Sequence, residues 1–187
     1  MKKIILLLLF IPFFGFSQEN IYSEPSLFIK KSSYVQINMD ENEKAIFKSG
    51  MNESVEFFPS EIIDLKTNNK LNGLAVESTY VVGSQGMATI KAKETAWIGM
   101  NEIADLVIWF DKYVIPNLDS PAGKNKTVKY IFNTKEIMLK FEIYNSTQIF
   151  SVIINNSIYR DKYFWTETKV KDIPNVVKTL KYLQTKG

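Results

Sequence analysis

The chain contains no histidine and no cysteine, and this limits the chemistry that its side chains can perform. Histidine is the usual general base near neutral pH, and these two residue types supply most ligands of zinc and copper sites. Ser-His-Asp and Cys-His nucleophile systems and thiol redox chemistry are therefore excluded. Carboxylate chemistry, a serine with a lysine base, or a hard cation held by oxygen atoms remain.

Carboxylate catalysis requires two acids that flank the reacting bond, one of them with a raised pKa. Glu102 and Asp105 share one face of a predicted helix and form a candidate pair. They are explained more simply as acids in the first turns of that helix, where its dipole favours anions. Glu77 and Glu94 lie in apolar predicted strands and are no better supported. We assign no catalytic residue.

The serine, glycine and acidic motifs are all incomplete. Gly83-Ser84-Gln85-Gly86 lacks the spacing, the following helix and the base of a nucleophile elbow. Ser120 and Lys124 are one residue too far apart for Ser-x-x-Lys, and Gly123-Lys124 lacks the upstream glycine of a P-loop. Asp40-Glu41-Asn42-Glu43 lacks the ligand pattern of an EF-hand and predicts a turn. We predict no metal and no cofactor.

Four aromatic residues form the candidate ligand site: Trp97, Trp109, Phe110 and Phe141 lie in strongly apolar segments. If the sheet and a helix enclose a cavity, these side chains would line it and hold a small apolar or aromatic ligand. The alternative is that they fill the core, as aromatic side chains more often do.

Two segments predict helices that would carry or cover these residues. Residues 101–115 begin with Asn101 as N-cap and end before Pro116. Residues 172–185 begin with Asp172 as cap and tolerate Pro174 in the first turn. The apolar residues at helical spacing are Ile103, Leu106, Val107, Phe110, Tyr113 and Val114 in the first, and Ile173, Val177, Leu180 and Leu183 in the second.

Most of the remaining chain predicts strands. Residues 27–37 begin strand-like, and Pro59 separates segments 55–58 and 61–67 as an edge or a break. Return strands follow at 71–82 and 87–98. Alternation of apolar residues from 128 to 154 predicts an antiparallel meander, with a short strand at 163–165. The elements together predict an α+β domain in which an antiparallel sheet of about six to nine strands carries two helices on one face.

The chain is predicted to be exported as a single domain. Lys2 and Lys3 precede an apolar run at residues 4–16, and Gly15-Phe16-Ser17 offers small residues for cleavage after Ser17. That run is shorter than the roughly 20 residues of a membrane-spanning helix, and the lack of cysteine excludes a lipid-anchored product. We predict a signal peptide at 1–17, a loose leader at 18–26 and one domain at 27–187, located in the periplasm or secreted.

The two halves of the predicted mature chain differ in charge and share a weak pattern. Residues 18–120 contain 9 lysines against 15 acids, whereas residues 121–187 contain 12 basic residues against 5 acids. We interpret these charges as neutralising one another in the fold, and a single arginine argues against nucleic-acid binding. Ala96-Trp97 and Phe164-Trp165 each precede a helix, a pattern compatible with duplication of 27–118 and 121–187.

Three functional hypotheses follow from these observations. The first is an exported, non-enzymatic binding or scaffolding protein whose partner is an envelope protein. The second is a carrier in which the four aromatic residues hold a small apolar ligand. The third is a carboxylate-dependent hydrolase, which requires two acids within about 5 to 10 Å in a cleft.

Overall fold

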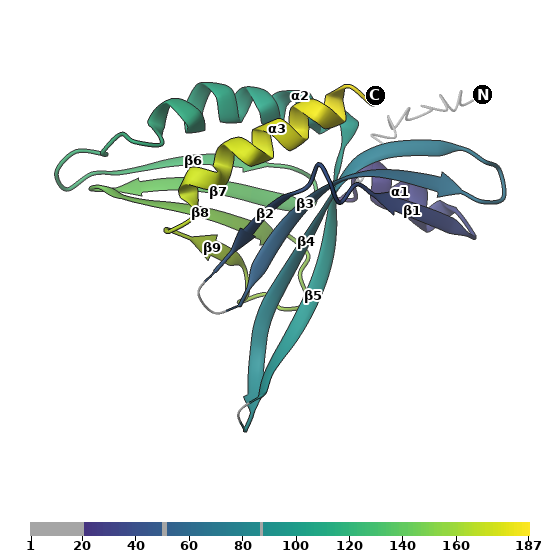
Figure 1. Ribbon diagram of the computed structural model, residues 1–187, viewed down its shortest axis with the longest axis horizontal. Helices are drawn as coiled ribbons and strands as arrows, with labels where there is room; N and C mark the ends of the chain where they lie inside the picture. The colour runs from purple at the N-terminus through teal and green to yellow at the C-terminus, as the bar shows by residue number, and fades with distance from the viewer. Residues whose placement is uncertain (1–20, 50–51, 87) are drawn as a thin grey trace, which may run out of the picture.

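The computed structural model describes residues 21–49, 52–86 and 88–187, and these form an α+β fold. Nine antiparallel strands form two sheets, and three α-helices pack against them (Figure 1). The predicted fold class is therefore confirmed. The predicted single sheet is divided in two, and one helix more is present than the sequence indicated. The predicted signal peptide at 1–17 lies outside the described residues.

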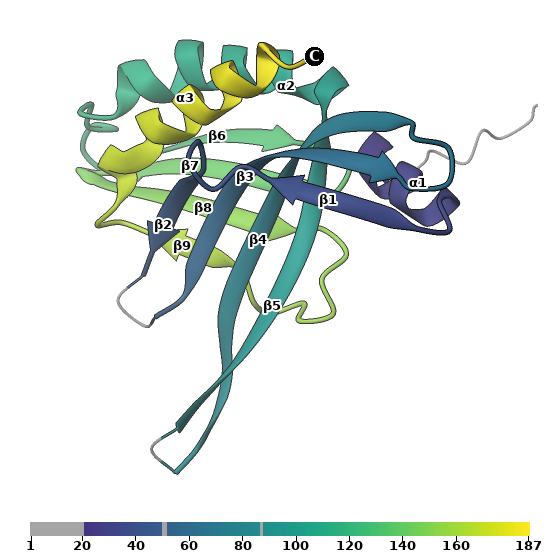
Figure 2. The same ribbon diagram turned by 45° about the vertical axis from the view of Figure 1, so that its right-hand side comes forward.

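The first sheet curls into a half-barrel (Figure 2). Its strand order is β1-β3-β4-β5, and β2 pairs with β3 on the same side as β1. The Asn68 backbone has a positive φ of 59° in the predicted turn between β3 and β4. The strands are β1 (Val35–Met39), β2 (Ala45–Lys48), β3 (Ser54–Asp64), β4 (Lys70–Gln85) and β5 (Ala88–Gly99).

Pro59 does not end a strand, in contrast to the prediction. It lies inside β3 and is buried, opposite Leu74 of β4. The β2 ladder on β3 ends at Phe57, and the β1 ladder begins at Ser60. Pro59 lies in the gap between these two ladders, where its missing N–H has no neighbouring strand to bond. Its carbonyl accepts the Asp40 N–H at 2.8 Å, where the chain leaves β1.

The second sheet is the predicted meander, with strand order β6-β7-β8-β9. One face of β7 is fully buried because its apolar residues alternate with polar ones, as in Leu139 and Phe141 around Lys140. The strands are β6 (Thr127–Asn133), β7 (Ile137–Tyr144), β8 (Thr147–Ile154) and β9 (Phe164–Thr166).

The predictions of a loose leader to residue 26 and of a strand from residue 27 are wrong for the described part of that segment. Residues 24–31 form helix α1 (Glu24–Lys31), and Ser23 before it is fully buried. The Ser23 side chain accepts the Ser26 N–H at 3.3 Å, and Pro25 occupies the first turn. These are ordinary helix-start signals. Packing against the first sheet then overrides the weak strand propensity of the segment.

Helix α2 (Met100–Trp109) begins at Gly99 as N-cap, and not at Asn101 as predicted. Its regular turns end at Trp109, and a π-helical segment, Phe110–Val114, continues it. The wider turn changes which side chains face the core. Val114 is buried, but Tyr113, predicted on the apolar face, is 49 % exposed.

Helix α3 (Ile173–Gln184) confirms the predicted second helix, and it lies beside α2 over the sheets (Figure 1). Its apolar stripe packs into a core shared by α2, the half-barrel and the meander. Leu180 and Leu183 are buried there, together with Phe47, Phe57 and Leu139 from both sheets. The fold is therefore closed by the C-terminal helix, which brings residue 182 beside residue 40.

Candidate functional site

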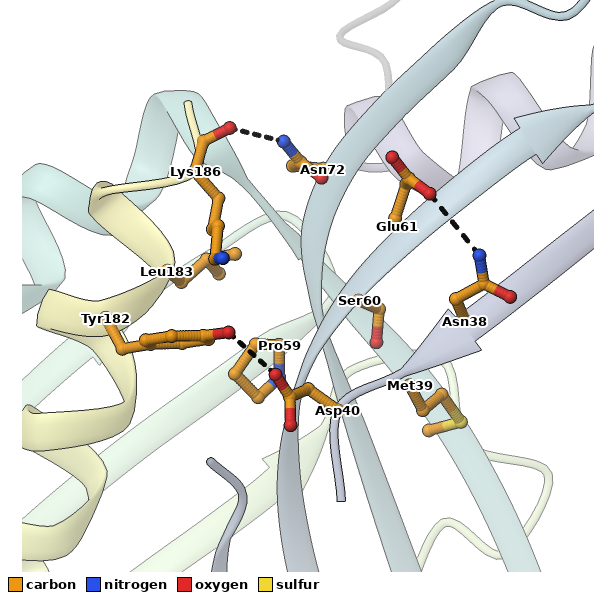
Figure 3. Close-up of a pocket in the computed structure, with 10 residues that line it drawn as sticks. All are labelled: Asn38, Met39, Asp40, Pro59, Ser60, Glu61, Asn72, Tyr182, Leu183 and Lys186. Atoms are coloured by element: carbon orange, nitrogen blue, oxygen red, sulfur yellow. Dashed lines mark hydrogen bonds between the residues drawn. The ribbon is translucent and has the colours of Figure 1, made fainter. Parts of the chain in front are cut away.

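A groove lies where the C-terminal end of α3 meets the gap between β1 and β2, and we call it the α3 groove (Figure 3). Its volume is about 440 Å³. Pro59 accounts for its position, because β1 and β2 separate on β3 at that residue. The lining residues are Asn38, Met39, Asp40, Pro59, Ser60, Glu61, Asn72, Tyr182, Leu183 and Lys186.

Hydrogen bonds between distant parts of the chain form the walls of the groove. The Tyr182 hydroxyl donates to Asp40 Oδ2 at 2.7 Å across its mouth (Figure 3). One turn earlier in α3, the Thr179 hydroxyl donates to the Glu43 carbonyl at 2.7 Å. On the other side, Asn72 Nδ2 donates to the Lys186 carbonyl at 2.6 Å. The first two contacts hold α3 against the turn that follows β1, and the third joins the residues after α3 to β4.

Asp40 is an acceptor for donors from two directions. Besides Tyr182, the backbone N–H groups of Asn42 and Glu43 donate to its Oδ1 at 3.0 and 3.3 Å. The Tyr182 hydrogen bond is the main reason that the pKa of Asp40 lies below its ordinary value of 3.8. The acidic turn at residues 40–43 is thus confirmed as a turn, and its first carboxylate faces the groove.

Glu61 supplies the second carboxylate of the groove. Lys70 Nζ lies 3.0 Å from its Oε1, and Asn38 Nδ2 donates to its Oε2 at 3.3 Å. The lysine contact is the main cause of a pKa below the ordinary value of 4.5. Both groove carboxylates are therefore ionised at neutral pH.

Apolar and cationic groups complete the groove. Met39, Pro59 and the buried Leu183 contribute apolar atoms, and the Lys186 Nζ lies 4.9 Å from the centre of the Tyr182 ring. An ammonium at that distance is attracted to the face of an aromatic ring. The groove therefore combines ionised acceptors, amide groups, one cation and an apolar floor.

The two groove carboxylates lack the raised pKa of a general acid. General acid catalysis by a carboxyl group requires a pKa raised towards neutrality. Asp40 and Glu61 have pKa values shifted in the opposite direction. Within the described residues, no three acidic side chains gather closely enough to hold a metal ion.

The four predicted ligand-lining aromatics do not form one site. Trp109, Phe110 and Phe141 are buried in the main core, with the Trp109 and Phe110 rings 4.7 Å apart. Trp97 is buried in a second cluster, with Phe58 and other residues on the opposite face of the first sheet. On strand β5 its side chain points away from those of Ala96 and Ile98, which face the main core. The prediction of a cavity shared by all four is wrong for this reason.

The acids weighed as catalysts are occupied elsewhere in the fold. Glu102 accepts the backbone N–H of Gly99 at 3.2 Å and that of Lys135 at 3.0 Å, so it joins the start of α2 to the second sheet. Asp105 is exposed on α2. Glu77 pairs with Lys93, and Glu94 accepts the Ser157 hydroxyl at 2.6 Å.

The sequence did not indicate the α3 groove, because its residues come from four separate segments of the chain. Asp40 was interpreted only as part of a turn, and Tyr182 and Asn72 were not considered. One signal was present, since Pro59 marked an interruption in a strand. The prediction placed the interruption in the strand itself, whereas it lies in the neighbouring ladders.

Comparison of the chain with protein-family models, with curated proteins and with solved structures finds no match. No helix in the described part of the chain is long and apolar enough to cross a membrane.

Proposed function

We propose that the protein is an exported, non-enzymatic binding protein, and that the α3 groove binds a small, uncharged, polar ligand of the saccharide type. The observation that carries the proposal is the pair of ionised carboxylates, Asp40 and Glu61, in a groove that also offers amide groups. Carboxylates accept hydrogen bonds from hydroxyl groups, and asparagine both donates and accepts. A polyhydroxylated ligand presents both kinds of partner.

The charges of the groove favour a neutral ligand. Glu61 is paired with Lys70, and the Asp40 carboxylate receives three hydrogen bonds. Lys186 adds a positive charge on the opposite wall. A cationic ligand would be repelled by Lys70 and Lys186, and an anionic ligand would be repelled by the two carboxylates. Neither charge is therefore complementary to the whole groove.

The apolar part of the groove supports the same class of ligand. Met39, Pro59 and Leu183 lie between the polar walls. The C–H face of a sugar ring buries apolar surface while its hydroxyl groups reach the sides. Export rests on the predicted signal peptide at residues 1–17, and a saccharide ligand is compatible with a location outside the cytoplasm.

The other two hypotheses receive less support. A carrier for an apolar ligand needs space next to the aromatic residues, but Phe110 and Phe141 are fully buried among other side chains. A carboxylate-dependent hydrolase needs one acid with a raised pKa, and neither groove acid has one.

The proposal is tested by titrating the ¹⁵N-labelled mature chain with glucose, N-acetylglucosamine and maltose. Glucosamine and glucuronate serve as charged probes of similar size. We expect saturable shifts of the Asn38, Ser60 and Asn72 amide signals with at least one neutral sugar. The charged probes should cause smaller shifts at the same concentrations.

Two groove variants and one control complete the test. Asp40→Asn and Glu61→Gln should each weaken sugar binding by about tenfold, because a hydrogen bond to an ionised group is replaced by a weaker one. Asp105→Asn removes the same charge from an exposed site on α2 and should leave binding unchanged. Shifts confined to other surfaces, or sugar hydrolysis that Asp40→Asn abolishes, would contradict the proposal.

A further inference from the structure

Strand β5 forms an edge of the first sheet, and part of that edge is open. It pairs with β4 alone among the described strands. In an antiparallel pair, the N–H and C=O groups of alternate residues point away from the partner strand. On β5 these are the odd-numbered residues, because Trp97 and Gly99 direct their N–H groups to side chains outside the sheet.

Carboxylates satisfy the outward N–H groups that flank the open stretch. Glu136 accepts the Trp97 N–H at 2.9 Å, and Glu102 accepts the Gly99 N–H at 3.2 Å. On the far side of the same hairpin, Glu53 accepts the Val81 N–H at 2.9 Å, directly beyond the end of the β3 ladder. The fold thus satisfies edge groups of this hairpin with carboxylates at three positions.

No such acceptor lies beside the outward N–H groups of residues 89–95. Thr89, Lys91, Lys93 and Thr95 form no hydrogen bond along this edge within the described residues. The hairpin carrying them extends away from the body of the molecule beyond the end of β3 (Figures 1 and 2). Residues 78–90 contain no charged side chain, and the side chain of Ile90 is 46 % exposed. Lysine side chains protect exposed strand edges against pairing with another copy of the same strand, and on this edge they are Lys91 and Lys93.

A pocket of about 300 Å³ adjoins the inner end of the open edge, and we call it the β5 pocket. It lies between α1 and the end of β8. Tyr22, Ile29, Trp97 and Ile154 contribute apolar or aromatic groups to it, and Thr95 belongs both to the pocket and to the edge. A strand added along β5 would therefore reach a site for one apolar side chain.

We propose that the open edge of β5 binds an extended, acidic segment of a partner protein, which adds to the sheet as a further strand and places an apolar side chain in the β5 pocket. Backbone hydrogen bonds to residues 89–95 would provide affinity, as in other cases of strand addition. This site is separate from the α3 groove and does not depend on the function proposed for it.

The lysines of the β5 edge determine which kind of partner strand it favours. Lys91 and Lys93 project from the same face of the edge. Lys93 is paired with Glu77 of β4, whereas Lys91 forms no ion pair within the described residues. A partner strand with acidic residues opposite these lysines is therefore favoured. A second copy pairing antiparallel over residues 89–95 would be centred on Ala92. It would place Lys91 of each copy opposite Lys93 of the other, and like charges directly opposite destabilise a sheet.

The test uses a capped heptapeptide of alternating valine and aspartate, added to the ¹⁵N-labelled mature chain. We expect slower amide hydrogen exchange at Thr89, Lys91, Lys93 and Thr95, with little change at the even-numbered residues between them. A matched peptide with lysine in place of aspartate should bind at least about tenfold more weakly. Absence of protection at millimolar concentrations of the acidic peptide would overturn the proposal.

Two protein variants and one pair of peptides separate strand addition from nonspecific charge attraction. Lys91→Pro removes an outward donor without removing a β4 hydrogen bond, and Lys91→Gln removes the charge alone. We expect Lys91→Pro to weaken binding more than Lys91→Gln. N-methylation of the peptide at residues whose N–H groups face β5 should abolish binding, whereas N-methylation at the alternate residues should preserve it.

Two further outcomes would refute the proposal. Equal binding of the two N-methylated peptides would mean that no strand is added, whether or not Lys91→Pro folds. Concentration-dependent protection of residues 89–95 without any peptide would mean that a second copy occupies the edge. Analytical ultracentrifugation of the unliganded chain should accordingly show a monomer.

Discussion

The Ser23 hydroxyl donates to the Glu136 carboxylate at 2.6 Å and joins residues 113 positions apart. The Ser23 N–H donates to the same oxygen at 2.8 Å, and the Trp97 N–H donates to the other oxygen at 2.9 Å. Glu136 is buried, so these hydrogen bonds stabilise its carboxylate away from water and also satisfy the three donors. One side chain from the turn between β6 and β7 thereby connects the start of α1 with β5.

Removal of the Glu136 carboxylate should destabilise the fold strongly. We expect Glu136→Ala to lower the free energy of unfolding by about 3 kcal/mol, because buried donors lose a charged acceptor. Urea denaturation measures the change. Glu167→Ala, at an exposed position, is the control and should stay within about 0.5 kcal/mol of the wild type. Equal effects of the two variants would contradict the role given to Glu136.

The two tryptophans Trp109 and Trp165 should differ sharply in their contribution to stability. Trp109 is 6 % exposed and packs against Phe110, whereas Trp165 is 48 % exposed on the outer face of β9. We expect Trp109→Ala to cost about 3 to 5 kcal/mol, from lost burial and a cavity. Trp165→Ala should cost less than about 1 kcal/mol. A loss below 1 kcal/mol for Trp109→Ala, measured by urea denaturation, would show that the core is packed differently.

The contact between Tyr182 and Asp40 should make stability depend on pH in the acidic range. The folded-state pKa of Asp40 lies below its ordinary value of 3.8, so the contact stabilises the fold above that value. This stabilisation is lost as the pH falls through the lower folded-state pKa. Tyr182→Phe should therefore reduce the free energy of unfolding at pH 6, and the deficit should shrink below about pH 3.

The matched control for this pH effect is Tyr34→Phe. Tyr34 is exposed, and its hydroxyl forms no hydrogen bond with the described residues. Unfolding of this variant should follow the wild-type pH profile. A Tyr182→Phe deficit that is constant from pH 6 to pH 2 would show that the hydrogen bond is not coupled to ionisation of Asp40.

Two buried hydroxyl groups of β4 should be replaceable without loss of stability. The Ser78 Oγ and the Tyr80 hydroxyl are buried and form no hydrogen bond with good geometry among the described residues. Burial raises the pKa of the Tyr80 phenol, and the neighbouring Ser78 opposes this only in part. The double variant Ser78→Ala and Tyr80→Phe should gain up to about 1 kcal/mol, measured by urea denaturation. A loss of that size would reveal an ordered partner for these groups.

Periodic segments were the most predictable part of the fold. Helix α3 and strand β7 each have one buried face, and helical spacing or alternation of apolar residues marks that face locally. Strand β6 alternates exposed with half-buried residues, and β8 is buried on both faces at its centre. Helix α1 is not apparent from the sequence because its segment is short and strand formers follow its start signals, Ser23 and Pro25. The π-helical segment after Trp109 leaves Tyr113 exposed, and no local sequence pattern indicated this segment.

The candidate sites were less predictable than the elements that carry them. The sequence groups Trp97 with Trp109 because both are large and apolar. Neighbouring residues of a strand face opposite sides of a sheet, however, and Trp97 lies on the side away from the main core. Asp40, Asn72 and Tyr182 meet only because α3 returns across the first sheet. The open edge of β5 likewise follows from strand order, and strand order is set by pairing between distant segments.

The sequence by itself determined the fold class, the faces of the periodic elements and the catalytic chemistries that require histidine or cysteine and are therefore excluded. These properties depend on residue types and on spacings of a few residues. The tertiary structure alone decided that two sheets form in place of one, that Pro59 lies opposite a gap between β1 and β2, and that Tyr182 reaches Asp40. Such contacts reflect burial and hydrogen bonding summed over the whole chain, so no local pattern contains them.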